Sequence, residues 1–248
     1  MSFLLVFFVS AEKVIIISQI TGCIIGVYRI CLSLLWMICC IPLAFGIYVA
    51  YVSKAIILAL PCIILAVPAG IATTALYYAV NKVIRHSRGY LWSSFWHSFK
   101  TNMKQGAFVT LVVAAAVVLV GLDGYIMYQF AKAGEKSGVL YVVFFVLMLV
   151  VIAWAIYVFP YMARFENSTK LILKNSALMA IGNLPKTFMA LMFFLACCIG
   201  TYLLPVVAII SPALGMLLLN YILEGVFERY MSDEDREAEN ERNQEFYN

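Results

Sequence analysis

The chain has 248 residues, of which 65% are hydrophobic and 12% are charged, and its mean hydropathy is +0.97. Because a water-soluble globular protein has an apolar share nearer half, this composition excludes that class and indicates an integral membrane protein. The net charge of +4 divides into +9 for residues 1–227, with 14 Lys and Arg against five acids, and −5 for residues 228–248, with three Arg against eight acids. The basic body favours contact with a bilayer that carries anionic headgroups. No groove-reading motif accompanies the bases, so no nucleic acid partner is expected.

Residues 1–28 open the chain with two short apolar runs separated by Glu12-Lys13. Neither run reaches the about 20 residues that a helical membrane span needs. We therefore predict an interfacial entry helix for this segment, with a spanning position as the alternative.

An all-α, polytopic transmembrane helical bundle with about six spans is predicted from the apolar runs that follow. Residues 1–227 form one transmembrane domain, with spans expected near residues 30–52, 55–80, 107–130, 138–160, 187–209 and 211–227. The last two spans divide one long apolar block at Ser211-Pro212, a pair that often starts a helix. Pro42 in the first span, and Pro61 and Pro68 in the second, are expected to kink or break them. The acidic tail 228–248 is expected to be solvated.

Two loops carry much of the positive charge. Residues 81–105 hold five Lys and Arg and no acid, and residues 163–186 hold four against Glu166, whereas residues 131–137 hold two bases and one acid. The positive-inside rule places the two longer loops in the cytoplasm. With six spans, both termini are then cytoplasmic as well.

Residues 88–105, RGYLWSSFWHSFKTNMKQ, form the most strongly patterned stretch of the chain. At about 100° per residue, the apolar side chains fall in one arc of a helical wheel, and polar and basic residues cover the opposite side. The arc contains Leu91, Trp92, Phe95, Trp96, Phe99 and Met103, and the basic residues opposite are Lys100 and Lys104. This pattern predicts a helix that lies on the membrane surface. It is either a linker resting on the bilayer or a helix that docks on another protein through its aromatic anchors.

Three polar side chains interrupt the predicted spans. An ionisable group inside a span costs about 2.5 to 3.5 kcal/mol on insertion scales, so one interpretation of Asp123 is a transport or proton-transfer role. The other is a packing contact with Tyr125, Tyr128 or a neighbouring span. Asn220 and Glu224, one turn apart in the last span, receive the same two interpretations, and Glu224 is close enough to the cytoplasm to be solvated.

The motifs of common catalytic and metal sites are missing from the sequence. It contains no HExxH, GxSxG, Walker or GxGxxG pattern, so we expect neither enzyme activity nor a cofactor. The seven cysteines lie in apolar runs without ligand spacing, so no metal site is expected. Because no ATP-binding motif is present, any coupling to ATP would need a partner.

Several segments resemble the YesL-like family of bacterial membrane proteins, a domain of unknown function in Firmicutes. The most specific is FWHSFKTNMKQG at residues 95–106, preceded by Ala75-Leu76-Tyr77-Tyr78 and Arg88-Gly89-Tyr90. Leu35-Trp36 to Pro42 is similar to the family's first span. Three further segments are similar to the second cytoplasmic loop of the family, and they are Arg164-Phe165-Glu166, Leu173-Lys174-Asn175 and Asn183-Leu184-Pro185. The resemblance covers nearly the whole chain.

The resemblance implies a place in a bacterial plasma membrane and an accessory role beside a carbohydrate ABC transporter, with its permease or ATPase subunits as partners. The loop from Leu173 to Lys186 is also loosely similar to the loop by which ABC permeases dock on their ATPases. Two other hypotheses stay open. One is a small self-sufficient secondary transporter or channel-like protein, suggested by Asp123 and the proline-broken spans. The other is a purely structural membrane protein.

Within this family pattern, Lys100-x-Asn102 and Lys174-Asn175 each precede a span in a basic loop. We predict that Asn102 and Asn175 are buried caps or cross-links that hold the two loops against the bundle, because an amide on an apolar face is costly without a partner.

Overall fold

The computed structural model describes residues 30–54, 56–86, 91–209, 211–231 and 236–237. The predicted entry helix and nearly all of the acidic tail lie outside the described residues. The described part is helical and contains no strand. Its α-helices are Ile30–Ser53, α2 (Ala59–Leu65), α3 (Val67–His86), α4 (Leu91–Thr101), α5 (Met103–Lys132), α6 (Tyr141–Arg164), α7 (Thr169–Gly182), α8 (Leu184–Leu203) and α9 (Ser211–Tyr230). Short 3-10 helices, Ile56–Leu58, Lys136–Leu140 and Pro205–Ile209, connect some of them.

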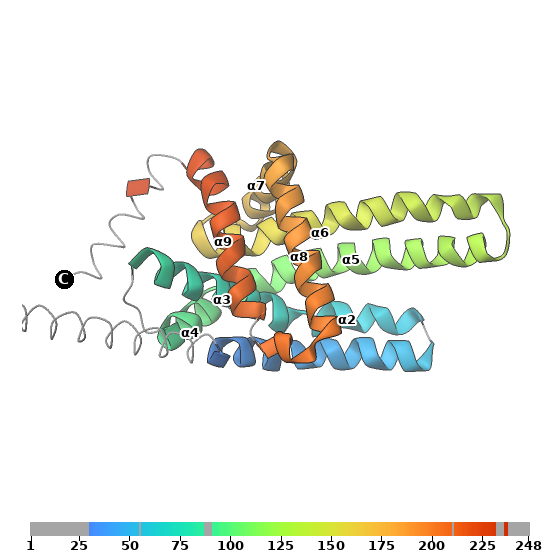
Figure 1. Ribbon diagram of the computed structural model, residues 1–248, viewed down its shortest axis with the longest axis horizontal. Coiled ribbons are helices and arrows are strands. Elements are labelled where there is room, and N and C mark those ends of the chain that lie inside the picture. The colour runs from blue at the N-terminus through green and yellow to red at the C-terminus, as the bar shows by residue number, and fades with distance from the viewer. Residues whose placement is uncertain (1–29, 55, 87–90, 210, 232–235, 238–248) are drawn as a thin grey trace, which may run out of the picture.

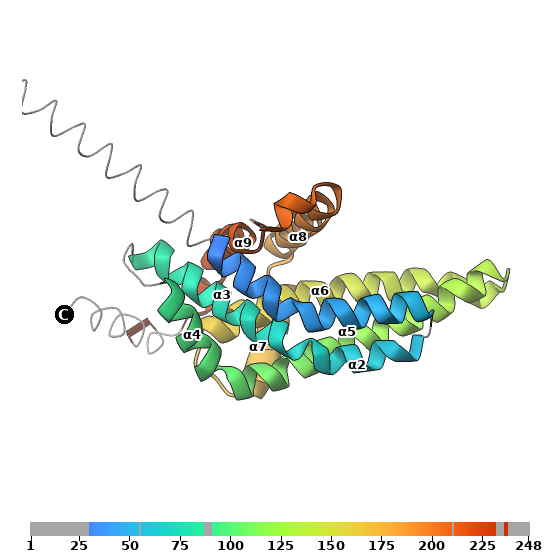
Figure 2. The same ribbon diagram turned by 90° about the horizontal axis from the view of Figure 1, so that it is seen from below.

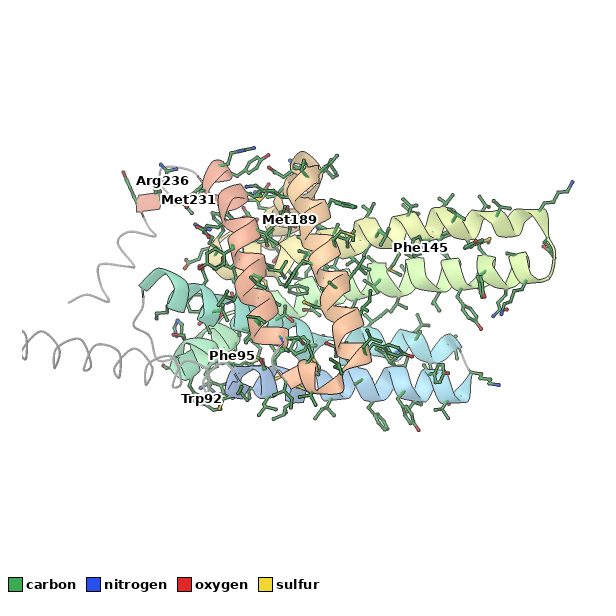
Figure 3. All side chains as sticks on the ribbon, in the orientation of Figure 1. Trp92, Phe95, Phe145, Met189, Met231 and Arg236 are labelled. Carbon is green, nitrogen blue, oxygen red and sulfur yellow. The ribbon has the colours of Figure 1, made fainter. Side chains whose placement is uncertain are left out.

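Two long antiparallel hairpins give the molecule its length (Figure 1). The Ile30–Ser53 helix turns back through α2 into α3, and α5 turns back into α6. Gly134, whose φ of 82° suits a glycine, lies in the second turn. The far half of the α5–α6 hairpin projects beyond the other helices and exposes large apolar side chains such as Phe145 (Figure 3). Such a surface is compatible with lipid and not with water, which supports a multi-pass membrane protein.

Four helices are long and apolar enough to cross a membrane, judged by length and composition among the described residues. They are Ile30–Ser53, Met103–Lys132, Gly138–Arg164 and Leu184–Leu203, and the bent pair Ala59–Leu65 and Val67–Lys82 would make a fifth. The expected count of six spans is therefore not confirmed. Residues 211–227, the sixth expected span, do form a helix, α9, but α9 also carries polar residues including Asn220 and Glu224 and is not one of the candidates.

The prolines affect the helices less than expected. The Ile30–Ser53 helix continues through Pro42, and Pro61 lies in the first turn of α2, where a missing N–H removes no helical hydrogen bond. The second predicted span is broken at Ala66, between α2 and α3, where the two axes meet at 41°. Pro68 follows this break as the second residue of α3. Kinking of both predicted spans by proline is thus not confirmed.

Two apolar clusters hold the helices together. One surrounds the inner half of α6 and includes Tyr157, Ile172 and Phe227, so it joins α6 to α7 and α9. The other joins the Ile30–Ser53 helix to α3 and α4 through Leu32, Leu76 and other buried residues. Both clusters lie at the same end of the hairpins.

Helices α8 and α9 lie across the hairpins instead of along them. In Figure 1 both run steeply across the horizontal α5–α6 pair, and Figure 2, turned by 90°, shows them nearly end-on. α9 packs against α3, and its start is tied to the first helix because the backbone N–H of Ala213 donates to Ser33 Oγ at 3.2 Å. The hydropathy pattern predicted helices here, but it did not predict their transverse direction.

Candidate functional site

The two basic loops meet at one end of the long hairpins, opposite the turn formed by residues 131–137 (Figure 1). α4 leads into the start of α5, and α7 follows the end of α6. All of the side chains predicted for an interaction site belong to this end. They are Trp92, Phe95, Trp96, Phe99, Lys100, Asn102 and Lys104 from the first loop, and Arg164, Glu166, Lys174 and Asn175 from the second.

The helix predicted within residues 88–105 is present as α4, but its apolar arc does not face a single environment. Phe95 is fully buried in the cluster with Leu32 and Leu76, whereas Trp92 is 49% exposed. Ser94 and Ser98, which lie outside the apolar arc of the wheel, are buried as well. The reason is that α4 packs against α3, so protein replaces lipid on one side of the helix. Figure 3 labels both Trp92 and Phe95 on this helix.

The aromatic residues of α4 form a chain of ring contacts. The ring centroids of Trp92 and Trp96 are 6.2 Å apart, and those of Trp96 and Phe99 are 5.6 Å apart, both in edge-to-face arrangements. Phe95 stacks on Phe99 at 6.1 Å. These pairs link the exposed Trp92 to the buried core, so they fix its position. The outward side of this chain borders a shallow, open groove along one face of α4, lined by Trp92, Ser93, Trp96, His97 and Lys100.

The two basic loops are joined by amide hydrogen bonds. The side-chain amide of Gln105 donates to the backbone oxygen of Asn167 at 2.7 Å. The amides of Asn167 and Asn175 both donate to the hydroxyl oxygen of Tyr161, each at 3.0 Å. Tyr161 itself is buried and stacks on Phe165 with 4.6 Å between ring centroids. Asn175 therefore makes the predicted cross-link from the second loop to α6, although it is only half-buried.

Asn102 behaves differently from Asn175. It occupies the N-cap position of α5, but its side chain makes no capping hydrogen bond. Instead, its amide donates to the backbone oxygen of Ser98 at 3.0 Å and lies 3.2 Å from Ser98 Oγ. These partners are one turn earlier in the same loop, so Asn102 closes the end of α4 and makes no cross-link to another helix. It is half-buried, not buried as predicted.

The second loop exposes an apolar stripe along α7. Leu171, Leu178 and Ile181 are 44%, 56% and 64% exposed, and their spacing places them on one side of a helix. Lys170 and Lys174 are exposed beside them. The opposite side of α7 is held to α6, because the Trp154 ring nitrogen donates to Leu173 O at 3.2 Å and to Ser176 Oγ at 3.1 Å.

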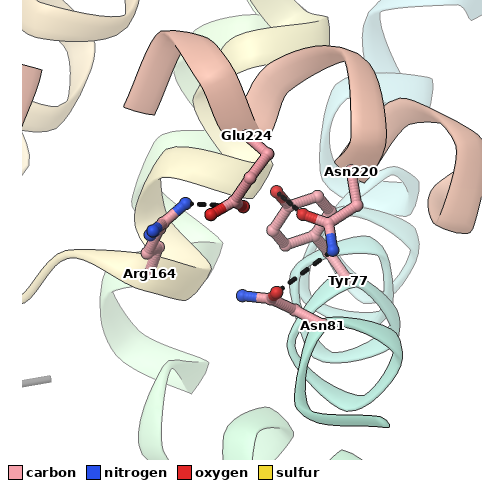
Figure 4. A network of polar contacts seen from close by, with 5 residues as sticks. All are labelled: Tyr77, Asn81, Arg164, Asn220 and Glu224. Carbon is pink, nitrogen blue, oxygen red and sulfur yellow. Dashed lines mark hydrogen bonds and ion pairs between the residues drawn. The ribbon is translucent and has the colours of Figure 1, made fainter. Parts of the chain in front are cut away.

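Behind the loops, a partly buried ion pair links α6 to α9 (Figure 4). Arg164 Nη1 lies 2.8 Å from Glu224 Oε2, and the two side chains are 3% and 25% exposed. The Arg164 guanidinium carbon also lies 5.9 Å from the ring centroid of Phe165 and 5.7 Å from that of Phe227. Glu224 is thus not simply a solvated residue, because its partly exposed side chain also pairs with a buried arginine.

Asn220 connects α9 to α3 through two further hydrogen bonds (Figure 4). The hydroxyl of Tyr77 donates to Asn220 Oδ1 at 2.7 Å, and Asn220 Nδ2 donates to Asn81 Oδ1 at 3.1 Å. We call these five residues, Tyr77, Asn81, Arg164, Asn220 and Glu224, the α9 network. These contacts are the partners that the packing interpretation of Asn220 and Glu224 requires. Sequence reasoning missed Tyr77 and Asn81, and the polar residues of α9 were the signal that such partners must exist.

Asp123 does not join this network or any other. It lies on the projecting half of α5, it is exposed, and it has no hydrogen-bond or ion-pair partner among the described residues. The residue one further along, Gly124, faces α6, since a Cβ there would lie 3.2 Å from Phe144 Cβ. Asp123 thus points away from its neighbouring helix, and the predicted packing contacts with Tyr125 and Tyr128 are not made.

Within the described part of the chain, no three His, Cys, Asp or Glu side chains come together as a metal site. The six cysteines described there, Cys31, Cys39, Cys40, Cys62, Cys197 and Cys198, are free thiols.

Long apolar helices joined by buried polar contacts define a helical, multi-pass membrane protein. Residues 30–124 match the family model described as "Protein of unknown function, DUF624". The match covers the first described helix, α2 to α4 and most of α5, and it does not reach the second basic loop or α9. No curated protein and no solved structure matches the chain.

Proposed function

We propose that the chain is a non-enzymatic accessory subunit that associates with a carbohydrate ABC transporter in a bacterial plasma membrane, with both termini and both basic loops in the cytoplasm. Its docking surface is the exposed stripe of α7, formed by Leu171, Leu178 and Ile181, supported by α4 at the same end. The YesL-like resemblance motivates the choice of partner, and the match to a family of unknown function is consistent with it.

The observation that carries the proposal is the combination of a rigid base and an exposed apolar stripe. α7 is fixed from behind by Trp154 and Asn175, so its outward side chains are held in place before any partner binds. A stripe of three exposed aliphatic residues flanked by lysines suits the docking of a protein groove or helix. Pre-organisation of this kind reduces the entropy that docking would otherwise cost.

The connection from α7 to α8 supports the same function. α7 ends at Gly182, Asn183 separates the helices, and α8 begins with Leu184-Pro185. Asn183 is buried and donates to Met179 O at 3.1 Å and to Tyr230 Oη at 3.3 Å, so the turn is tied to α9. A short surface helix followed by a fixed turn is the arrangement expected of a docking loop between a membrane subunit and a cytoplasmic ATPase.

Of the other hypotheses, a self-sufficient transporter or channel-like protein receives less support. Acidic residues of transport pathways face the interior of a bundle or a water-filled cavity. Asp123 points outward from the α5–α6 hairpin instead. A purely structural membrane protein would turn the stripe of α7 toward lipid, and recovery of a partner protein is what separates it from the docking function. The basic ends of the loops contact anionic headgroups in either case.

Co-purification from native membranes tests the proposal. A tagged wild-type chain should recover a sugar permease or its ATPase in stoichiometric amount, and Leu178→Glu should reduce that recovery at least about tenfold by placing a charge in the docked face. Val139→Glu is the matched control, because Val139 is an exposed apolar residue at the opposite end. Recovery of the chain alone, without permease or ATPase, would contradict the proposal.

A further inference from the structure

The groove on the outward side of α4 is separate from the α7 stripe, and the proposed docking function does not use it. Its walls are the rings of Trp92 and Trp96, and its polar lining is Ser93, His97 and Lys100. The ring contacts of Trp96 with Phe95 and Phe99, at 5.9 Å and 5.6 Å, anchor the aromatic wall to the core. The aromatic part of the groove is therefore held in place by ring contacts, and Ser93, His97 and Lys100 are exposed beside it.

The residues that line the groove suit an amphipathic ligand that has an anionic group next to an apolar group. Lys100 is exposed and supplies an ammonium group, while Ser93 and His97 supply hydroxyl and ring N–H donors. No Asp or Glu occurs in the sequence between residues 81 and 122. Indole rings beside a cationic group are the typical composition of a surface at the membrane boundary.

The position of the groove identifies the source of that anion. α5 begins at Met103, directly after α4, and is one of the candidate spans. Lys100 and Lys104, which bracket this start, are both exposed. A groove next to the first residues of a span lies at the level of the lipid headgroups, where phosphate groups are held at the top of acyl chains.

We propose that this groove binds the headgroup of an anionic phospholipid. The phosphate accepts hydrogen bonds from Lys100, His97 and Ser93, and the glycerol and upper acyl chains pack along Trp92 and Trp96. This site binds one lipid specifically, beyond the general attraction of basic loops to an anionic leaflet. Because it concerns the isolated chain, it can be tested without any partner protein.

Native mass spectrometry of the purified full-length chain, with added phosphatidylglycerol or phosphatidylcholine of matched acyl chains, provides the test. We expect preferential retention of phosphatidylglycerol. Lys100→Gln should lower that retention about fivefold, the change expected for one lysine near an anionic headgroup. Lys136→Gln, which removes an exposed lysine at the opposite end of the hairpin, should leave it unchanged. Trp92→Ala should also weaken retention, because charge attraction alone would not require the ring.

Several outcomes would overturn the proposal. Equal retention of the two lipids, or an equal loss in Lys100→Gln and Lys136→Gln, would show that no specific site exists. Displacement of the lipid by millimolar inorganic phosphate would identify a site for free phosphate. A dimer that Trp92→Ala dissociates, without lipid preference, would assign the groove to a second copy of the chain. If the lipid preference emerges only after residues 1–29 are removed, the groove is the binding site of that segment and not of a lipid.

Discussion

The ion pair between Arg164 and Glu224 predicts an unequal response to removal of its two members. Replacing Glu224 with Leu removes the carboxylate that lies 2.8 Å from the Arg164 guanidinium, and the Arg164 side chain is only 3% exposed. Breaking a buried ion pair from one side costs about 3 to 5 kcal/mol, because a charge is left in a poorly solvated place. Replacing Arg164 with Met leaves a carboxylate that is 25% exposed and can be hydrated, so this loss should be nearer about 1 to 3 kcal/mol.

The double variant Arg164→Met, Glu224→Leu should be more stable than Glu224→Leu alone. Both charges are then absent, and the methionine can pack on the rings of Phe165 and Phe227 that now lie 5.9 Å and 5.7 Å from the guanidinium carbon. Replacement of a buried pair by apolar residues is often neutral or stabilising. The coupling between the two sites should therefore be at least about 2 kcal/mol.

Equilibrium unfolding in mixed micelles, followed by tryptophan fluorescence, measures these free energies of unfolding. Trp154 on α6 reports on the affected region, and Glu237→Leu in the exposed tail controls for the loss of an acid. Equal losses in the two single variants would refute the argument from unequal exposure. A double variant whose loss equals the sum of the single losses would refute the direct pairing.

Three further outcomes are expected. Gly70→Ala should lower the free energy of unfolding by about 1 to 3 kcal/mol, because a Cβ there would overlap a threonine side chain of α5. Gly215→Ala is the control, since Gly215 has open space around it and its replacement should be neutral or stabilising. Similar effects of the two changes would contradict the close approach of α3 and α5. In the same assay, Tyr161→Phe should lower the free energy of unfolding more than Asn175→Ala does, because Tyr161→Phe removes the acceptor of two amide hydrogen bonds and Asn175→Ala removes one donor. Equal losses in the two variants would show that only one of the two hydrogen bonds contributes to stability. Asp123→Leu should make insertion of the α5 segment more favourable by about 2 to 3 kcal/mol in a translocon assay, and an unchanged value would mean that Asp123 already reaches water.

The spans that hydropathy located well are those whose surroundings are mostly lipid. Residues 30–52 were expected, and the helix is Ile30–Ser53; residues 107–130 were expected, and α5 extends from Met103 to Lys132. The prediction works because a bilayer requires an apolar side chain at almost every exposed position along a span, whatever its neighbours are. Helix ends were less well located, since α5 continues into polar residues that the hydropathy pattern assigned to loops.

The α9 network could not be predicted in detail because its partners are far apart in the sequence. Tyr77 and Asn220 are separated by 143 positions, and Arg164 and Glu224 by 60. The polar residues of α9 indicated that partners were needed, but any buried donor or acceptor on another helix would have met that need. In the same way, the wheel of α4 separated apolar from polar residues without showing that α3 would cover Phe95.

The direction of α8 depends on the same distant contacts. By composition α8 can span a bilayer, yet it lies across α5 and α6 (Figures 1 and 2). If the α5–α6 hairpin spans the bilayer along its length, α8 does not run parallel to it. Contact with lipid does not determine whether α8 lies along the α5–α6 hairpin or across it, because the apolar side chains of α8 suit lipid in either direction. The contacts that do distinguish them are polar. Asn220 and Glu224 hold α9 to α3 and α6, and α9 carries α8 with it through the turn at Pro205–Ile209. The polar residues that exclude α9 from the candidate spans are thus the ones that fix α9, while the hydrogen bond between Tyr157 and Thr187, at 3.0 Å, holds the start of α8 to α6 directly.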